Sequence, residues 1–262
     1  MKNFNQFWGE IRVVVGGFLV TILFMLLTGC QVNESPNELF ISVAASLQES
    51  LEELVVLFEE IHPETQVHLN FGGSNVLKRQ IVEGFEVDLF LSAHVEQVEE
   101  LMNLDRVERR DPFARNEVVL VASSEKIQVF EDIANVGVRL IFANEAVPIG
   151  VYSQEILTKV EEESPGFKEM TLANVISKED NVRQVLLKVS LGEGDGAFVY
   201  RTDALVAENT LKVIELPEAY GVESELYMAL LKADEIKAEA RDFYEFILEP
   251  IGQEVFRKHG FQ

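Results

Sequence analysis

The sequence has few of the residues on which several classes of protein depend. Its single cysteine excludes an intramolecular disulfide, and 22 basic against 45 acidic residues give a formal net charge of −23, which disfavours nucleic acid and anionic lipid as partners. No G-x-S-x-G elbow and no distinctive pair of carboxylates is present, so nothing selects an enzyme. We also expect no metal-cation site, because the four histidines lack ligand spacing. They are His62, His68, His94 and His259.

Long apolar runs are also scarce, and the one that exists lies near the N-terminus. Val13–Leu27 is uncharged, follows Lys2 and Arg12, and is too short to span a bilayer comfortably, which is typical of a secretory signal. We therefore expect residues 1–29 to be a signal peptide and the rest of the chain to be exported. An uncleaved anchor helix is the alternative, and two glycines inside the run argue against it.

The segment LTGC, which ends at Cys30, resembles the lipobox of bacterial lipoproteins. Cys30 would then become the mature N-terminus and carry a lipid, and residues 30–37 read as a polar, proline-broken tether. Loss of Lys2, Arg12 and Glu10 with the signal leaves 20 basic and 44 acidic residues, a formal charge of −24. We expect the body of the protein to lie outside the cytoplasm at a membrane surface.

Two apolar periodicities alternate along the remaining chain. Short apolar runs typical of buried strands are followed by segments with apolar residues at helical spacing. This order predicts an α/β protein with mainly parallel sheets flanked by helices. The expected strands are 39–44, 67–71, 87–92, 118–122, 138–143, 197–200, 211–216 and 226–231, and the expected helices are 46–61, 76–82, 95–104, 150–160, 182–189 and 238–248.

The strand-to-helix junctions are the places where such a fold binds ligands, because free N–H groups of helix N-termini point there. Ser46 stands at the first junction, and with Glu49 three residues later it also matches a capping box. Ser74 follows two glycines that allow close backbone approach, and no Glu or Gln stands three residues after it. The other two junctions pass through Pro148–Gly150 and Asn181–Val182.

GEGDGA, at 192–197, matches the loose form of a dinucleotide-binding loop. It follows an expected helix and precedes an expected strand, which is the reverse of the order such a loop needs. The carboxylates of Glu193 and Asp195 would also repel phosphates. We therefore predict a turn.

Eight segments occur in an order shared with a known family. They are AASL, FGGSNVLKRQI, VDLFLSA, NEVVLVA, VPIGVYSQEIL, DNVRQVL, FVYRTDAL and FYEFILEPIGQEVFRKHGF. Together they resemble the molybdate-binding proteins of bacterial ABC importers, over most of the chain from about Leu39 to Phe261. The resemblance implies a two-lobe periplasmic-binding-protein fold of type II with the ligand in the interlobe cleft. It places lobe 1 at 38–115 and 228–262, and lobe 2 at 116–227.

The resemblance also implies which residues hold the ligand. Proteins of that family bind a tetrahedral oxyanion through two serines, two main-chain amides and a tyrosine hydroxyl. Carried over position by position, the two serines are Ser46 and Ser74, and the tyrosine is Tyr200. The two main-chain amides are those of Ile149 and Val182. Ile149 departs from the family, which commonly has alanine there. Because this position acts through its backbone, we expect the larger side chain to be tolerated if it points away, and to narrow the pocket otherwise.

The function implied is that of an extracytoplasmic lipoprotein that captures molybdate, and also tungstate, and delivers it to a membrane permease and its ATPase. We expect a monomer that is anchored by the lipid on Cys30 and has no cofactor besides its oxyanion ligand. The two oxyanions share shape and charge, so the residues do not choose between them. The alternatives are a receptor for another tetrahedral oxyanion such as sulfate, a cell-surface hydrolase, or a structural surface lipoprotein without anion dependence.

Overall fold

The computed structural model describes residues 37–207 and 209–262, and Asn37–Gln262 form one compact unit by themselves. The predicted signal peptide, the lipidation site at Cys30 and nearly all of the tether lie outside the described residues. Within the described part of the chain, no helix combines the length and apolar character needed to cross a bilayer.

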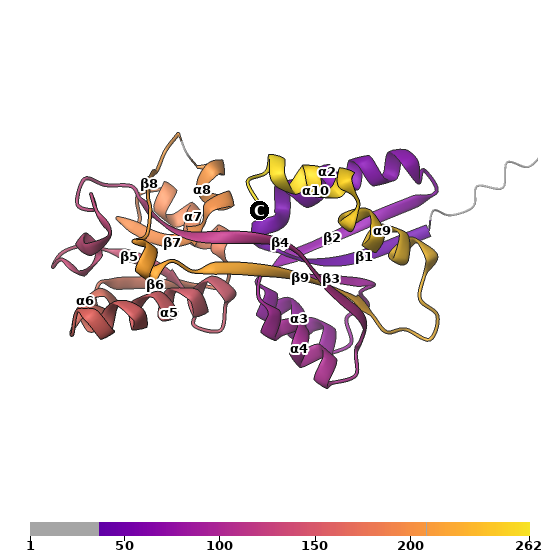
Figure 1. The fold of residues 1–262 in the computed structure, drawn as a ribbon, viewed down its shortest axis with the longest axis horizontal. Coiled ribbons are helices and arrows are strands. Elements are labelled where there is room, and N and C mark those ends of the chain that lie inside the picture. Colours follow the sequence, from indigo (N-terminus) through magenta and orange to yellow (C-terminus); the bar gives the residue numbers. More distant parts are fainter. Residues whose placement is uncertain (1–36, 208) are drawn as a thin grey trace, which may run out of the picture. The chain divides into compact units, whose positions relative to one another are not determined.

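Strands and helices alternate along the chain, as the sequence predicts (Figure 1). The strands are β1 (Asn37–Ala44), β2 (Thr65–Gly72), β3 (Leu89–Ser92), β4 (Val107–Ala122), β5 (Leu140–Ala143), β6 (Val175–Glu179), β7 (Gly196–Tyr200), β8 (Lys212–Ile214) and β9 (Glu223–Leu231). The helices are α2 (Gln48–Ile61), α3 (Ser74–Val82), α4 (Val95–Asn103), α5 (Pro148–Glu163), α6 (Phe167–Ala173), α7 (Val182–Ser190), α8 (Arg201–Val206), α9 (Ala238–Leu248) and α10 (Pro250–Lys258). Three short 3₁₀ turns, η1 (Ala45–Leu47), η2 (Phe130–Ala134) and η3 (Glu218–Tyr220), complete the described elements.

The strands pair in the order β2-β1-β3-β9-β4-β7-β5-β6, with β8 added on β4. The long strand β4 divides this order into two halves. Its residues up to Glu117 pair with β9, and those from Val118 pair with β7. We call the strands β2, β1, β3, β9 and the first part of β4 the β1 half, and the strands β7, β5, β6, β8 and the last part of β4 the β7 half.

Strand directions in the two halves are more mixed than the predicted mainly parallel arrangement. The pairs β1-β2, β1-β3, β5-β6 and β5-β7 are parallel. The pairs β3-β9, β4-β7, β4-β8 and β4-β9 are antiparallel. The antiparallel pairs arise because β4 and β9, the strands that connect the halves, run against their neighbours. The α/β class is confirmed, and the division into two lobes with the stated bounds stays a prediction.

The central strands are buried on both faces, because helices cover each side of the two halves. Every residue of β3, β5 and β7 is buried. In the β1 half, α2, α9 and α10 lie on one face and α3 and α4 on the other (Figure 1). Such two-sided cover explains why these strands read as continuous apolar runs rather than as alternating patterns.

Candidate functional site

Helix starts from both halves meet around one small cavity. Its lining residues are Ala44, Ala45, Ser46, Gly72, Gly73, Ser74, Ala93, Val147, Pro148, Ile149, Asn181, Val182 and Tyr200. All five residues that the sequence predicts as ligands therefore line the same cavity, although their role as ligands stays a prediction. No lining residue carries an ionisable acid or base of the Asp, Glu, His, Lys or Arg type, so neutral donors must do any binding.

The cavity is small. About 20 Å³ is open to the centre of a water molecule. A single water needs about 10–15 Å³ by this measure, so the space suits a compact solute of few atoms. Sugars, peptides and nucleotides are too large for it in this conformation.

Ser46 lies in the 3₁₀ turn η1, between strand β1 and helix α2, and is 4% exposed. The capping box expected for Ser46 and Glu49 is wrong. Helix α2 begins two residues later than the pattern suggests, at Gln48, and its N-cap position has no side-chain hydrogen bond. Glu49 pairs with Arg183 instead, and the buried Ser46 hydroxyl has no hydrogen-bond partner in residues 37–207 and 209–262. This hydroxyl is therefore free for a ligand.

Ser74 is the first residue of α3 and is 1% exposed. Its hydroxyl oxygen accepts a hydrogen bond from the Ala93 N–H at 3.1 Å. A serine hydroxyl has one proton to donate and two lone pairs to accept with. Because the bond from Ala93 uses a lone pair, the Ser74 proton remains available to an acceptor in the cavity.

Tyr200 ends strand β7 and is 2% exposed. Its hydroxyl has no hydrogen-bond partner among the described residues. The nearby Ser224 hydroxyl donates its own proton to the Ala93 carbonyl at 2.8 Å. Burial raises the pKa of Tyr200 well above its usual value, so the phenol stays neutral and keeps its proton. Tyr200 is thus a buried donor that lacks an acceptor.

The two predicted main-chain donors stand at helix N-termini. Helix α5 begins at Pro148, which has no N–H, so Ile149 offers the first amide of that helix; Val182 begins α7. The first N–H groups of a helix have no acceptor inside it, and they carry the positive end of the helix dipole. Asn181 caps α7 by accepting from the Gln184 N–H at 3.0 Å, which leaves the Val182 amide for a ligand. Ile149 is 1% exposed and belongs to the hydrophobic core.

Gly73 allows the two halves to approach each other beside the cavity. A Cβ atom added at Gly73 would lie closer than 3.0 Å to the backbone carbonyl oxygen of Asp180, which precedes α7. The close backbone approach predicted for this glycine pair is confirmed at Gly73. Any larger residue would force the start of α3 away from the start of α7.

Sequence reasoning missed an ion-pair cluster next to the site. Arg183 contacts Glu49 and Asp203, with its Nη1 2.8 Å from Glu49 Oε1 and its Nε 2.9 Å from Asp203 Oδ1. Asp203 is fully buried, and this burial raises its pKa to about 6, although the charge of Arg183 acts in the opposite direction. The only signal in the sequence is the place of Arg183, directly after a predicted amide donor.

An aromatic contact near the cavity was also not predicted. His94 caps α4 by accepting from the Glu96 N–H at 3.2 Å. The centroid of its ring lies 5.1 Å from the ring centroid of Tyr152 in α5. Tyr152 in turn meets Tyr200 edge-to-face at 6.4 Å. Burial lowers the pKa of His94, so its ring is neutral at neutral pH. These rings support Tyr200 from outside the cavity.

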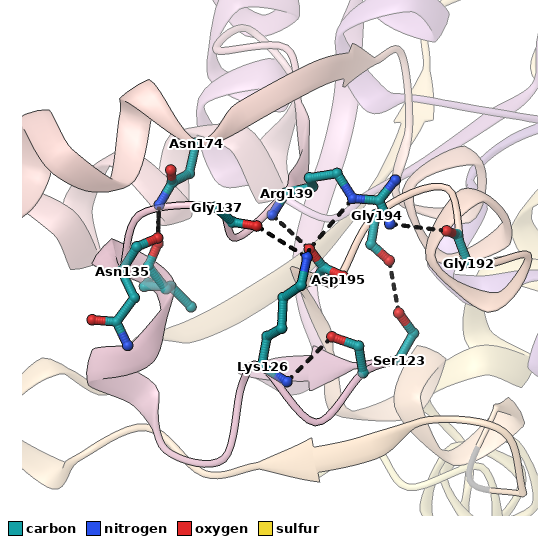
Figure 2. A network of polar contacts seen from close by, with 11 residues as sticks. Ser123, Lys126, Asn135, Gly137, Arg139, Asn174, Gly192, Gly194 and Asp195 are labelled. Atoms are coloured by element: carbon teal, nitrogen blue, oxygen red, sulfur yellow. Dashed lines mark hydrogen bonds and ion pairs between the residues drawn. The ribbon is translucent and has the colours of Figure 1, made fainter.

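The first four residues of the GEGDGA segment, 192–195, form the predicted turn, whereas Gly196 and Ala197 begin β7; the Asp195 carboxylate has a structural role (Figure 2). Asp195, 3% exposed, accepts from the Lys126 ammonium at 3.0 Å and from the Arg139 N–H at 2.8 Å. Ser123 donates to the Gly194 carbonyl at 2.7 Å. Although burial alone would raise the pKa of Asp195, these hydrogen bonds lower it below its usual value. The loop is therefore tied down by its acid and is not shaped for phosphate.

Comparisons with known proteins agree on the kind of protein involved. Residues 39–262 match the family described as bacterial extracellular solute-binding protein. A Bacillus subtilis (strain 168) protein, provisionally named ABC transporter substrate-binding lipoprotein YvgL, is 31% identical over 250 residues, which cover 91% of this chain and 94% of that protein. Molybdate-binding protein ModA of Mycobacterium tuberculosis (strain ATCC 25618 / H37Rv) is 28% identical over 232 residues, covering 87% of this chain and 85% of ModA.

A solved structure extends the comparison to the fold. The periplasmic molybdate-binding protein of Azotobacter vinelandii matches with a TM-score of 0.75 at 21% identity, covering 86% of this chain and 98% of that one. At this identity the likeness concerns the fold alone, and it confirms the predicted periplasmic-binding-protein fold.

Proposed function

The chain belongs to the bacterial extracellular solute-binding proteins, and from this membership we propose that it captures molybdate, and also tungstate, for an ABC importer. The bound anion would then pass to a membrane permease driven by its ATPase. Similarity to a substrate-binding lipoprotein and to proteins named for molybdate binding supports both the transport role and the choice of ligand.

One structural observation carries the proposal. Within the described part of the chain, two buried hydroxyls, those of Ser46 and Tyr200, have no hydrogen-bond partner, and they border the same small cavity as the first amides of α5 and α7. A buried polar group without a partner costs about 1–3 kcal/mol. Two such groups at one cavity are explained by a ligand that accepts hydrogen bonds from several directions at once.

A tetrahedral dianion is such an acceptor. Its four oxygens can each receive protons from hydroxyls and amides, and the N-termini of α5 and α7 add partial positive charge. A hydrogen bond to a charged group contributes about 1.5–3 kcal/mol. Five donors, those of Ser46, Ser74, Ile149, Val182 and Tyr200, are then enough to offset the entropy that the anion loses on binding.

The setting of the protein completes the proposal. We place it outside the cytoplasm as a monomer, held at the membrane by a lipid on Cys30. It has no cofactor, and molybdate is its cargo rather than a resident group. The permease acts on the closed form, in which the anion joins the β1 half and the β7 half.

Thermal unfolding of the fragment from Gln31 onward tests the ligand. This fragment contains the whole compact unit Asn37–Gln262. Molybdate, tungstate, sulfate and phosphate are added separately at equal ionic strength. An anion at a hundred times its Kd adds about 2.7 kcal/mol of stability, which raises the Tm of a protein of this size by roughly 5–10 °C. We expect this rise with molybdate and tungstate only.

Serine variants connect any such effect to the cavity. Ser46→Ala should weaken molybdate binding by about tenfold or more, the value of one hydrogen bond to a charged group. Ser42→Ala is the matched control, because Ser42 is also a fully buried serine without a hydroxyl partner but does not line the cavity. Equal effects of the two variants would count against Ser46 as a ligand.

The other outcomes identify the alternatives. A rise in Tm with sulfate alone would make the protein a receptor for a smaller oxyanion. No rise with any of the four anions would refute the proposal, and turnover of a substrate by the same fragment would indicate an enzyme.

A further inference from the structure

Arg183 connects the two halves of the strand order beside the cavity. It is the second residue of α7 in the β7 half, and its side chain reaches η1 and α2, which pack on the β1 half. Its Nη1 donates to Glu49 Oε1 at 2.8 Å, its Nη2 donates to Glu49 Oε2, and its Nε lies 3.2 Å from the Ala45 carbonyl oxygen. The guanidinium therefore holds the carboxylate with both ends of its fork.

A buried carboxylate anchors Arg183 on its own side. Asp203, in α8 of the β7 half, lies 2.9 Å from Arg183 Nε and is fully buried. Glu49, in contrast, has a side chain that is 37% exposed. Asp203 thus fixes the arginine in the β7 half, while the pairs with Glu49 and Ala45 cross to the other half. Of these contacts of Arg183, only the crossing pairs must break when the halves separate.

The crossing pairs involve the direct neighbours of two predicted ligands. Arg183 follows Val182, which offers its amide to the cavity, and Ala45 precedes Ser46, whose hydroxyl is unpartnered. The Ala45 carbonyl belongs to the same planar peptide unit as the Ser46 N–H. A donor from Arg183 to that carbonyl consequently fixes the position of Ser46 relative to the start of α7.

We propose that Arg183 is a positioning residue that fastens the closed cleft by pairing with Glu49 and the Ala45 carbonyl, which brings the donors of Ser46 and Val182 together. This inference rests on the proposed anion-binding function for its effect on affinity. Its effect on closure does not depend on the identity of the ligand. Arg183 does not touch the anion, since it does not line the cavity.

Kinetics of molybdate release test the proposal in the fragment from Gln31. Glu49→Gln leaves the Arg183–Asp203 pair intact and should raise the dissociation rate by about fivefold or more, because a hydrogen-bonded ion pair across the cleft is lost. Arg183→Met should raise it by about tenfold or more. The double variant should add little to Arg183→Met, because both changes remove the same pair. Additive effects would overturn the proposal.

Two further variants separate positioning from simple stability. Arg109→Met is the matched control: Arg109 also bridges two carboxylates, those of Asp111 and Glu245, but all three belong to the β1 half or pack on it. It should leave the dissociation rate unchanged. Arg183→Lys keeps the charge but not the fork, so it should restore the Tm more fully than the dissociation rate. If Arg183→Lys restores the Tm and the dissociation rate equally, relative to Arg183→Met, then Arg183 acts through stability alone.

A distance measurement tests closure without relying on the anion. The fragment from Gln31 has no cysteine, so spin labels can be placed at Val56→Cys in α2 and Leu187→Cys in α7, both exposed positions on different halves. In the ligand-free protein, Glu49→Gln should shift the distance distribution toward longer separations. Identical distance distributions for the wild-type protein and Glu49→Gln would overturn the proposed role of Arg183 in closure, whether or not molybdate binds. Failure of wild-type protein to bind molybdate, with the shift present, would refute only the proposed function.

Discussion

Replacing Tyr200 with phenylalanine should change ligand binding and intrinsic stability independently. The substitution removes only the hydroxyl, which has no hydrogen-bond partner in the portion of the chain that the structure describes, although Tyr200 is 2% exposed. Losing it therefore breaks no hydrogen bond within the protein. In the complex, the same hydroxyl would donate to the anion.

The expected magnitudes follow from these two situations. An unpartnered buried polar group costs about 1–3 kcal/mol, part of which water recovers whenever the cleft opens. The free energy of unfolding of ligand-free Tyr200→Phe should thus be unchanged or higher by up to about 1 kcal/mol. Loss of a hydrogen bond to a dianion costs about 1.5–3 kcal/mol, so Kd should rise by roughly 10- to 100-fold.

Tyr244→Phe provides the matched control. Tyr244 is 1% exposed, but its hydroxyl donates to Asp111 Oδ2 at 2.8 Å. Its removal should lower the free energy of unfolding by about 1–2 kcal/mol, because a part-buried hydrogen bond to a carboxylate is lost, and should leave Kd unchanged. Denaturant unfolding without ligand and calorimetric titration with molybdate measure the two quantities. Equal destabilisation of the ligand-free protein by Tyr200→Phe and Tyr244→Phe would contradict an unpartnered Tyr200 hydroxyl.

Three more predictions concern the cleft, the turn and the surface charge. Gly73→Ala should weaken molybdate binding by about tenfold or more, because its Cβ would meet the Asp180 carbonyl oxygen in the closed form. Gly221→Ala is the control and should leave binding unchanged, because its Cβ would have an ordinary 3.5 Å contact. Asp195→Asn should lower the free energy of unfolding by about 1–2 kcal/mol at neutral pH. Because the folded-state pKa of Asp195 is lowered, this deficit should be present above the unfolded pKa of about 4 and shrink as pH falls through the folded value, which pH-dependent unfolding would reveal. The association rate of molybdate, measured by stopped flow, should rise with salt between about 0.01 and 0.15 M, because screening weakens repulsion by a chain of net charge −23; a rate that falls with salt would contradict this.

Local patterns identified the elements that are buried on both faces or end at a strong signal. The apolar runs of β3 and β7 are fully buried, and α2 ends at Ile61, before the predicted stop at His62 and Pro63. Strand β4 was found only at its apolar end. Its first part, from Val107 to Glu117, is partly exposed where it pairs with β9, so it lacks an apolar run. Strand β6 was missed for the same reason, because it lies at the edge of the β7 half.

Side-chain partners distant in the chain were outside the reach of local patterns. Glu49 matched a capping box three residues after Ser46, but its partner Arg183 stands 134 residues further along the chain. An arginine fork outcompetes a helix-terminal N–H for a carboxylate, because it makes two bonds in which donor and acceptor are both charged. The family resemblance predicted that five residues share one site, and all five line one cavity in the structure. No motif in the sequence predicted the ion-pair cluster around Asp203.

Among the described residues, no Asp, Glu, His, Lys or Arg lines the cavity, which bears on how so acidic a protein would bind the proposed anion. The nearby arginine is matched by Glu49 and Asp203, so it adds no net positive charge to the cleft. Attraction must then come from helix N-termini and fixed hydroxyl protons, whose fields act only over short distances. Amide N–H groups cannot accept from a ligand O–H, and no carboxylate of the described residues lines the cavity to receive one. A fully deprotonated tetrahedral anion could accept from every donor, whereas the O–H of protonated phosphate would have only a serine or tyrosine hydroxyl oxygen as its acceptor. Under the proposed function, the choice among molybdate, tungstate and sulfate would fall to size, which would be set by how closely Gly73 and Arg183 let the two halves approach.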